Sequence, residues 1–103
     1  MKLTMTCAVF VLAGAASAWA QGDAKDLYLS KCASCHGADG AGKTAKGKKL
    51  KVQDAHAAIG KMSEDQMIKV VTDGKGQDMD GYSKTLTKDQ IKSLVDYYRS
   101  LGK

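Results

Sequence analysis

The chain contains no proline, and only six of its 103 residues are aromatic. Without proline, turns and helix ends must be set by glycine and by capping side chains. The sequence also lacks any sustained alternation of apolar and polar residues, any repeat and any linker long enough to divide it. These absences argue against strands and against a second domain. They predict one small domain of the all-α class.

The N-terminal residues show the three parts of a cleaved export signal in order. Lys2 supplies the cation, and an apolar run occupies residues 7–16. Ala18 and Ala20 are the small residues expected before a cut at Gln21. The apolar run is too short to span a membrane.

We therefore expect a signal peptide over residues 1–20 and a working domain over residues 21–103. The residues before Cys7 do not fit the processing that attaches a lipid, so no lipid anchor is predicted there. The expected product is a soluble periplasmic monomer without a transmembrane anchor.

Loss of the signal would leave the domain poor in apolar bulk. The only Trp and the only Phe leave with it, and residues 21–103 hold 13 Leu, Ile and Val side chains, about 16% of the segment. Chains of that composition struggle to fold unaided. The two remaining cysteines, Cys32 and Cys35, are too close in sequence to close a useful stabilising loop. The composition therefore predicts that a buried cofactor completes the core.

Residues 21–103 carry a net charge of +4. Cations and acids are interleaved along most of this segment, and export removes most nucleic-acid partners, so no nucleic acid is expected. Within residues 43–51, by contrast, five lysines occur without a carboxylate: Lys43, Lys46, Lys48, Lys49 and Lys51. This run is either a solvated loop or a docking patch for an acidic partner.

The first predicted helix covers residues 23–35. Asp23 is a suitable N-cap, and Ala24, Tyr28 and Cys32 recur at four-residue spacing on one face. This spacing gives the helix one apolar side that ends at a cysteine.

Two further helices are predicted over residues 63–74 and 87–102. Each begins with a capping box, Ser-x-x-Gln in one and Thr-x-x-Gln in the other, and each ends at a glycine. Residues 37–62 are expected to form a loop with one short helical turn at residues 54–59. Residues 75–86 are expected to form a second loop.

Residues 32–36 read Cys-Ala-Ser-Cys-His, which is the attachment sequence of c-type haem. Two thioethers three residues apart hold one edge of the porphyrin, and the next residue, His36, then lies under the iron. A dithiol redox site lacks the alternating strand and helix pattern expected around it. A zinc site would need Cys32, Cys35, His36 and His56, without a second paired motif. The motif therefore favours one covalently bound haem c.

With this motif the sequence resembles a small bacterial monohaem class I cytochrome c. Tyr28 lies four residues before the first cysteine, as an aromatic does in the family's first helix. Residues 94–101 resemble the family's final helix, and Tyr97 matches the aromatic that crosses the first helix there. The resemblance implies three main helices wrapped around one haem with an exposed edge. It implies an electron carrier with redox protein partners, and not an enzyme.

A thioether or an imidazole can fill the sixth position of a haem iron. The candidates are Met62, Met67, Met79 and His56. Met79 lies in a polar loop that resembles the family's methionine loop, with Tyr82 three residues on. Met67 falls on the apolar face of a predicted helix, and Met62 precedes its cap. We therefore predict that His36 and Met79 are the axial ligands, with His56 as the main alternative to Met79.

Two positions depart from the family pattern. Asp80 follows Met79 where the family usually has proline. Residues 47–50 read Gly-Lys-Lys-Leu where a loop proline usually helps to orient the proximal imidazole. The sequence therefore does not define the hydrogen-bond acceptor for the free nitrogen of His36.

Two other functions stay open at this stage. One is a small haem enzyme such as a peroxidase, and the other is a haem-based sensor or ligand-binding protein. Both need a vacant or weakly held sixth position. A stable bond from Met79 would indicate a carrier, because it leaves no site for a substrate.

Overall fold

The computed structural model describes residues 15–103, and it describes side chains from Asp23 onward. The predicted signal peptide, residues 1–20, therefore lies outside the residues whose side chains are described. Within the described residues the secondary structure is helical, apart from an isolated bridge between Lys75 and Met79. The predicted all-α class is confirmed.

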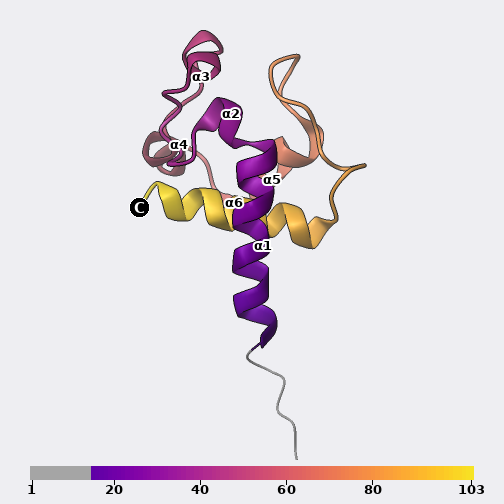
Figure 1. Ribbon diagram of the computed structural model, residues 1–103. Helices are drawn as coiled ribbons and strands as arrows, with labels where there is room; N and C mark the ends of the chain where they lie inside the picture. Colours follow the sequence, from indigo (N-terminus) through magenta and orange to yellow (C-terminus); the bar gives the residue numbers. More distant parts are fainter. Residues whose placement is uncertain (1–14) are drawn as a thin grey trace, which may run out of the picture.

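The described chain forms six helices (Figure 1): α1 Ala15–Lys31, α2 Ala33–His36, α3 Ala45–Lys49, α4 Ala55–Lys61, α5 Glu64–Asp73 and α6 Lys88–Leu101. Helix α1 crosses α6 near the middle of the molecule, and α5 also packs against α6. The segments before and after α3 and the loop after α5 project to the same side of this crossing.

Both predicted capping boxes are present. In α5 the Ser63 hydroxyl accepts from the Gln66 backbone N–H, and the Gln66 side chain accepts from the Ser63 backbone N–H. Thr87 and Gln90 make the same pair of hydrogen bonds at the start of α6. Each helix ends at the residue before its predicted glycine, and that glycine is the C-cap: Gly74 for α5 and Gly102 for α6.

Three predictions about helix positions were wrong. Helix α1 begins at Ala15 and not at Asp23, because the alanine-rich residues before Asp23 are strong helix formers. The same predicted helix does not run unbroken to Cys35, since α1 ends at Lys31 and residues Ala33–His36 form the separate helix α2. The segment predicted as loop contains α3, which begins after Thr44, because the Thr44 side chain accepts from the Gly47 backbone N–H and caps it. The short turn predicted at residues 54–59 is present as α4.

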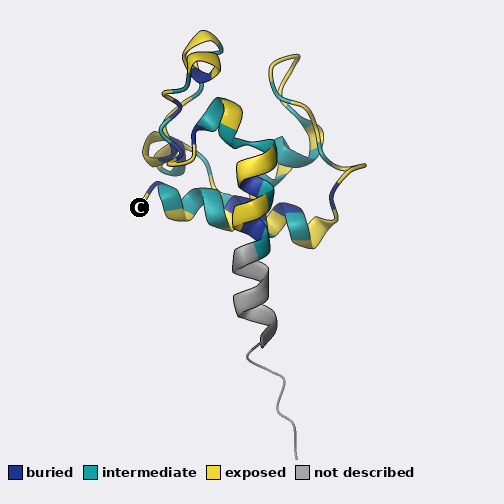
Figure 2. Ribbon diagram, viewed as in Figure 1, coloured by how far each residue is buried: buried dark blue, intermediate teal, exposed yellow. Residues whose placement is uncertain are grey.

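The buried apolar core is small and forms two clusters. The first contains Tyr28, Leu86, Ile91 and Leu94, and the second contains Ala58, Met67 and Val95. Buried residues gather where α1 crosses α6 (Figure 2). Among the described residues, Tyr28 is the only large side chain with less than 2% of its surface exposed. The shortage of apolar bulk noted in the sequence is therefore visible as a thin core.

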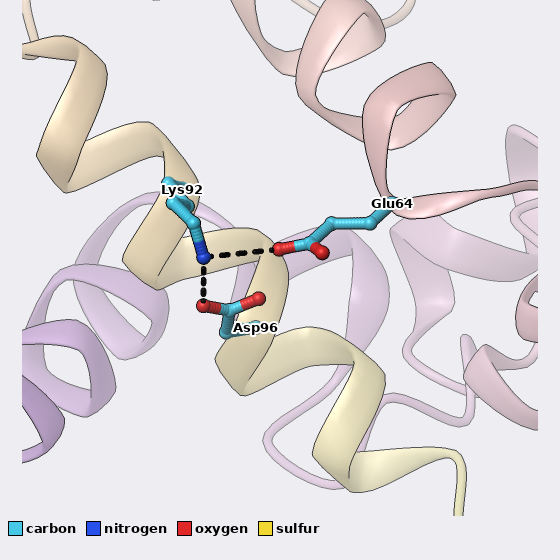
Figure 3. Close-up of polar contacts among 3 residues, drawn as sticks. All are labelled: Glu64, Lys92 and Asp96. Carbon is cyan, nitrogen blue, oxygen red and sulfur yellow. Dashed lines mark hydrogen bonds and ion pairs between the residues drawn. The ribbon is translucent and has the colours of Figure 1, made fainter.

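An exposed ion cluster joins α5 to α6 (Figure 3). Lys92 Nζ lies 3.0 Å from Asp96 Oδ2 within α6 and 3.3 Å from Glu64 Oε1 at the start of α5. Ion pairs this exposed add little to stability. The packing of α5 on α6 therefore depends mainly on the apolar residues between them.

Candidate functional site

A cavity of about 420 Å³ is lined by members of both core clusters. Every helix and the loop after α5 contribute to its wall. Much of the wall is apolar: Leu50, Val52, Ala58, Val70, Val71, Leu94 and Val95. Protein interiors are normally filled by closely packed side chains. Here the cavity, bordered by both core clusters, lies where such side chains would be expected.

Four residues predicted for the site lie on this cavity: Cys32, Cys35, His36 and Met79. The first three come from the junction of α1 and α2, and Met79 comes from the loop after α5. The structure therefore brings together two segments that are more than 40 residues apart in the sequence.

The local backbone explains how the two cysteines reach the same wall. Helix α1 ends at Lys31, yet the Cys32 N–H still donates to the Tyr28 carbonyl at 2.9 Å, so the helical path continues into α2. Residues three apart on a helical path lie on the same side. Both thiols are free and half-buried. Burial raises the pKa of Cys32 to about 11, so this thiol is protonated at neutral pH.

His36 ends α2, and its ring meets the Tyr98 ring edge-on with the centroids 5.3 Å apart. Burial lowers the pKa of His36. The ring is therefore neutral at pH 7, the form that binds a metal. Its Nδ1 atom is buried and has no hydrogen-bond partner in the structure. The described residues thus supply no acceptor for a hydrogen bond from this nitrogen, which agrees with the absence of proline from residues 47–50.

Tyr28 contacts the end of the segment that contains the two cysteines and His36. Its hydroxyl donates to the Gly37 carbonyl at 2.6 Å, immediately after His36. Its ring lies 5.2 Å from the ring of Tyr97, measured between centroids. The predicted aromatic contact at the helix crossing is therefore present.

Three methionines line the cavity, but only one of them lies outside the core. Met67 belongs to the second cluster, and its sulfur accepts from Arg99 Nη1 at 3.7 Å. Met62 packs against the same cluster, and its carbonyl accepts from Arg99. Met79 belongs to neither cluster of the described residues. Its side chain is therefore the one without a packing role, as expected of a ligand.

The loop that carries Met79 is held at its base. Lys75 N–H donates to the Met79 carbonyl at 2.8 Å, and Met79 N–H donates back at 3.3 Å. Gly74, with φ 83°, lies so close that a Cβ there would be 2.7 Å from the Met79 carbonyl oxygen. Beyond Met79, Tyr82 N–H donates to the Val71 carbonyl at 2.8 Å. These contacts fix Met79 relative to α5.

His56 is not among the residues that line the cavity. It is exposed, and its Nδ1 lies 2.7 Å from the Gly102 carbonyl oxygen. This contact ties the start of α4 to the end of α6. His56 therefore has a structural contact elsewhere, which weakens its claim as an alternative ligand.

Two residues at the site were missed by sequence analysis. Tyr98 lines the cavity beside His36, and the signal that could have found it is the helical spacing of Ile91, Leu94, Val95 and Tyr98 in the sequence. Thr44 hydrogen-bonds to the carbonyls at the end of α2. No sequence signal pointed to that contact, because the partners lie 9 and 10 residues away in another helix.

The residues present fit a covalently held haem: two free thiols three residues apart, a neutral imidazole, a thioether and an apolar wall. Over residues 15–103, no group of three or more His, Cys, Asp or Glu side chains is placed to hold a metal ion by itself. Nor, in the same part of the chain, is any helix long and apolar enough to cross a membrane.

Comparison with known proteins identifies a matching family and a similar solved structure. No curated protein matches the sequence. Residues 20–97 match the family described as Cytochrome C oxidase, cbb3-type, subunit III. The fold is similar to that of the KustC0563 c-type cytochrome, at 30% identity and a TM-score of 0.72, over 79% of this chain and 99% of that one. The chain therefore belongs to this cytochrome c family, which confirms the resemblance and implies haem c as its cofactor.

Proposed function

We propose that the protein is a periplasmic electron carrier that binds one haem c covalently through Cys32 and Cys35, with His36 and Met79 as axial ligands. The observation that carries this proposal is that all four side chains line one largely apolar cavity, although they come from segments far apart in the sequence. When bound, the haem supplies one-electron exchange between Fe(III) and Fe(II).

The chain's own residues then have separate tasks. The two thiols hold one edge of the cofactor, and the neutral ring of His36 provides the proximal nitrogen. The apolar wall would exclude water from the bound cofactor. Met79 would supply a thioether ligand to the iron, and this soft donor would favour Fe(II) and raise the reduction potential relative to a second imidazole. With both axial positions filled, no place is left for a substrate, so we propose a carrier and not an enzyme.

The charge of the cavity lining supports docking with an acidic redox protein. The lining contains four lysines, Lys31, Lys46, Lys51 and Lys75, against two aspartates, Asp78 and Asp80. Two of these lysines belong to the basic run at residues 43–51, whose lysines are all exposed. We propose that this run orients the haem edge toward its partner, that residues 1–20 direct export, and that the carrier works as a monomer without nucleic acid.

The test of ligation is the Met79→Ala variant. The covalent haem should remain, because Cys32, Cys35 and His36 are unchanged. The weak far-red absorption band of thioether-to-iron(III) ligation should disappear, and the variant should bind cyanide more readily. His56→Ala and Met62→Leu serve as matched controls and should keep the band.

Three results would contradict the proposal. The first is a far-red band that survives in Met79→Ala. The second is low-spin ligation that disappears in His56→Ala. The third is a wild-type protein that lacks the band and binds cyanide freely, and this result would favour a haem-based sensor, ligand-binding protein or peroxidase-like enzyme with an open sixth position.

A further inference from the structure

One hydroxyl group contacts two backbone carbonyls near the end of α2, the helix that contains Cys35 and His36. Thr44 Oγ1 lies 2.8 Å from the Ser34 carbonyl oxygen and 3.2 Å from the Cys35 carbonyl oxygen, so its single hydroxyl proton is shared between these two acceptors, with the shorter bond to Ser34. Helix α2 has only four residues, so these carbonyls find no partner further along it. The same oxygen accepts from the Gly47 N–H at 2.9 Å. Thr44 therefore caps α3 and fastens α3 to the end of α2.

Gly47 lets α3 approach α2 this closely. A Cβ at Gly47 would lie 2.2 Å from the Cys35 carbonyl oxygen and 2.7 Å from the Gly42 carbonyl oxygen. No side chain fits at such distances. Gly42 in turn donates its N–H to the His36 carbonyl at 2.8 Å. The loop thus contacts the last carbonyls of α2 by hydrogen bonds and by direct packing.

These contacts bear on the orientation of the proximal imidazole. A ligating histidine is usually oriented by a hydrogen bond from its second nitrogen. In this chain the Nδ1 atom of His36 is buried without a partner. The ring can then be oriented only by the backbone that carries it and by the side chains that pack on it, such as Tyr98.

We infer that Thr44 is a positioning residue for the haem iron, which sets the orientation of the His36 ring by fixing the backbone at the end of α2. This inference rests on the proposed function, because it takes His36 as an axial ligand. In most ligating histidines a hydrogen bond at the second ring nitrogen orients the imidazole. Here the Thr44 hydroxyl has that role, through the backbone.

The two roles of Thr44 can be separated by substitution. Thr44→Asp keeps a good N-cap for α3 but removes the donor, because a carboxylate only accepts hydrogen bonds. Thr44→Val removes both the cap and the donor. Thr44→Ser keeps both and should behave as the wild type. Thr87→Ala is the matched control, since it removes the N-cap of α6 without touching α2.

The measurement is electron paramagnetic resonance of the oxidised holoprotein, whose g-values report axial-ligand orientation. Urea unfolding of the same samples reports stability. We expect the g-values to shift in both Thr44→Asp and Thr44→Val and to stay unchanged in Thr44→Ser. Thr87→Ala should lower the urea midpoint without shifting the g-values.

Several outcomes would overturn the inference. Unchanged g-values in both Thr44→Asp and Thr44→Val would do so. A shift in Thr44→Asp alone would indicate the added charge, and a shift in Thr44→Val alone would indicate the lost cap. A shift in Thr87→Ala would show that the g-values follow stability in general. Failure of the proposed function looks different, because the wild-type protein itself would then lack covalent haem or a histidine-ligated spectrum.

Discussion

Tyr28 connects the helix crossing to residues 32–37 through a single hydroxyl. Burial raises the pKa of this hydroxyl above its ordinary value, so it is protonated at neutral pH and can donate a hydrogen bond. Tyr28→Phe should keep the ring packing against Tyr97 but lose the 2.6 Å hydrogen bond to the Gly37 carbonyl. We expect the holoprotein to lose about 1 kcal/mol of unfolding free energy, measured by urea titration.

Tyr97→Phe is the control for this prediction, because it alters a hydroxyl in the same ring pair without touching Gly37. Equal urea midpoints for Tyr28→Phe and the wild-type protein would show that the hydrogen bond contributes no net stability. The Tyr28 position would then be explained by ring packing alone.

The position of the four predicted site residues on one cavity could be inferred from the sequence. Cys32, Cys35 and His36 belong to one five-residue motif, and Met79 lies in a polar loop outside both core clusters. Their roles in binding haem stay predictions. Thr44 and Tyr98 could not be predicted in the same way. Their importance comes from contacts between separate helices, and a sequence pattern within one helix does not report which helix lies opposite.

At the level of elements, the base of the methionine loop depends on Gly74. Its φ of 83° is unfavourable for other residues, and a Cβ would lie 2.6 Å from the Gly81 nitrogen. Gly74→Ala should therefore displace the loop and weaken the proposed bond from the Met79 sulfur to the haem iron. We expect a reduced far-red band and faster cyanide binding, measured by absorption spectroscopy on the oxidised protein.

Gly60→Ala is the matched control. Gly60 lies inside α4, where a Cβ would meet nothing within 4 Å. Alanine at a helical position is favoured over glycine by up to about 1 kcal/mol, so this variant should be slightly more stable and should keep the band. If Gly74→Ala also kept the full band, the loop would not need its glycine to present Met79.

The helices differ in how far the sequence could predict them. Helices α5 and α6 carry capping boxes and regular apolar spacing, and both signals are local, so their positions were predicted closely. Helix α3 was predicted as loop because it contains Gly47, which lowers helix propensity. It forms because Thr44 caps it and because the same glycine allows it to pack on the Cys35 carbonyl. The tertiary contact outweighs the propensity here.

At the level of the whole molecule, both core clusters line the same cavity. They contain too few apolar residues to stabilise the folded chain by themselves. Ordering costs about 1 to 2 kcal/mol per residue in backbone entropy, and the described chain buries only nine apolar residues. A Cys32→Ala, Cys35→Ala double variant without haem should therefore be largely disordered. Circular dichroism of that variant should show little helix, and native helix content would contradict the prediction.

The distribution of charge over the whole molecule leads to the last prediction. If the basic run at residues 43–51 orients the haem edge, replacing Lys46, Lys48 and Lys49 with glutamine should slow bimolecular electron transfer to an acidic blue-copper protein. The reaction should also lose part of its dependence on ionic strength, since charges are screened over about 8 Å at physiological salt.

The control replaces three exposed lysines that lie outside both the run and the cavity: Lys25, Lys69 and Lys88. Both triple variants change the net charge by the same amount, so a general effect of charge would slow them equally. A local docking surface would slow only the first. Stopped-flow rates at several salt concentrations distinguish these outcomes. Equal rates for the two variants at every salt concentration would mean that the lysine run is a solvated loop without a part in docking.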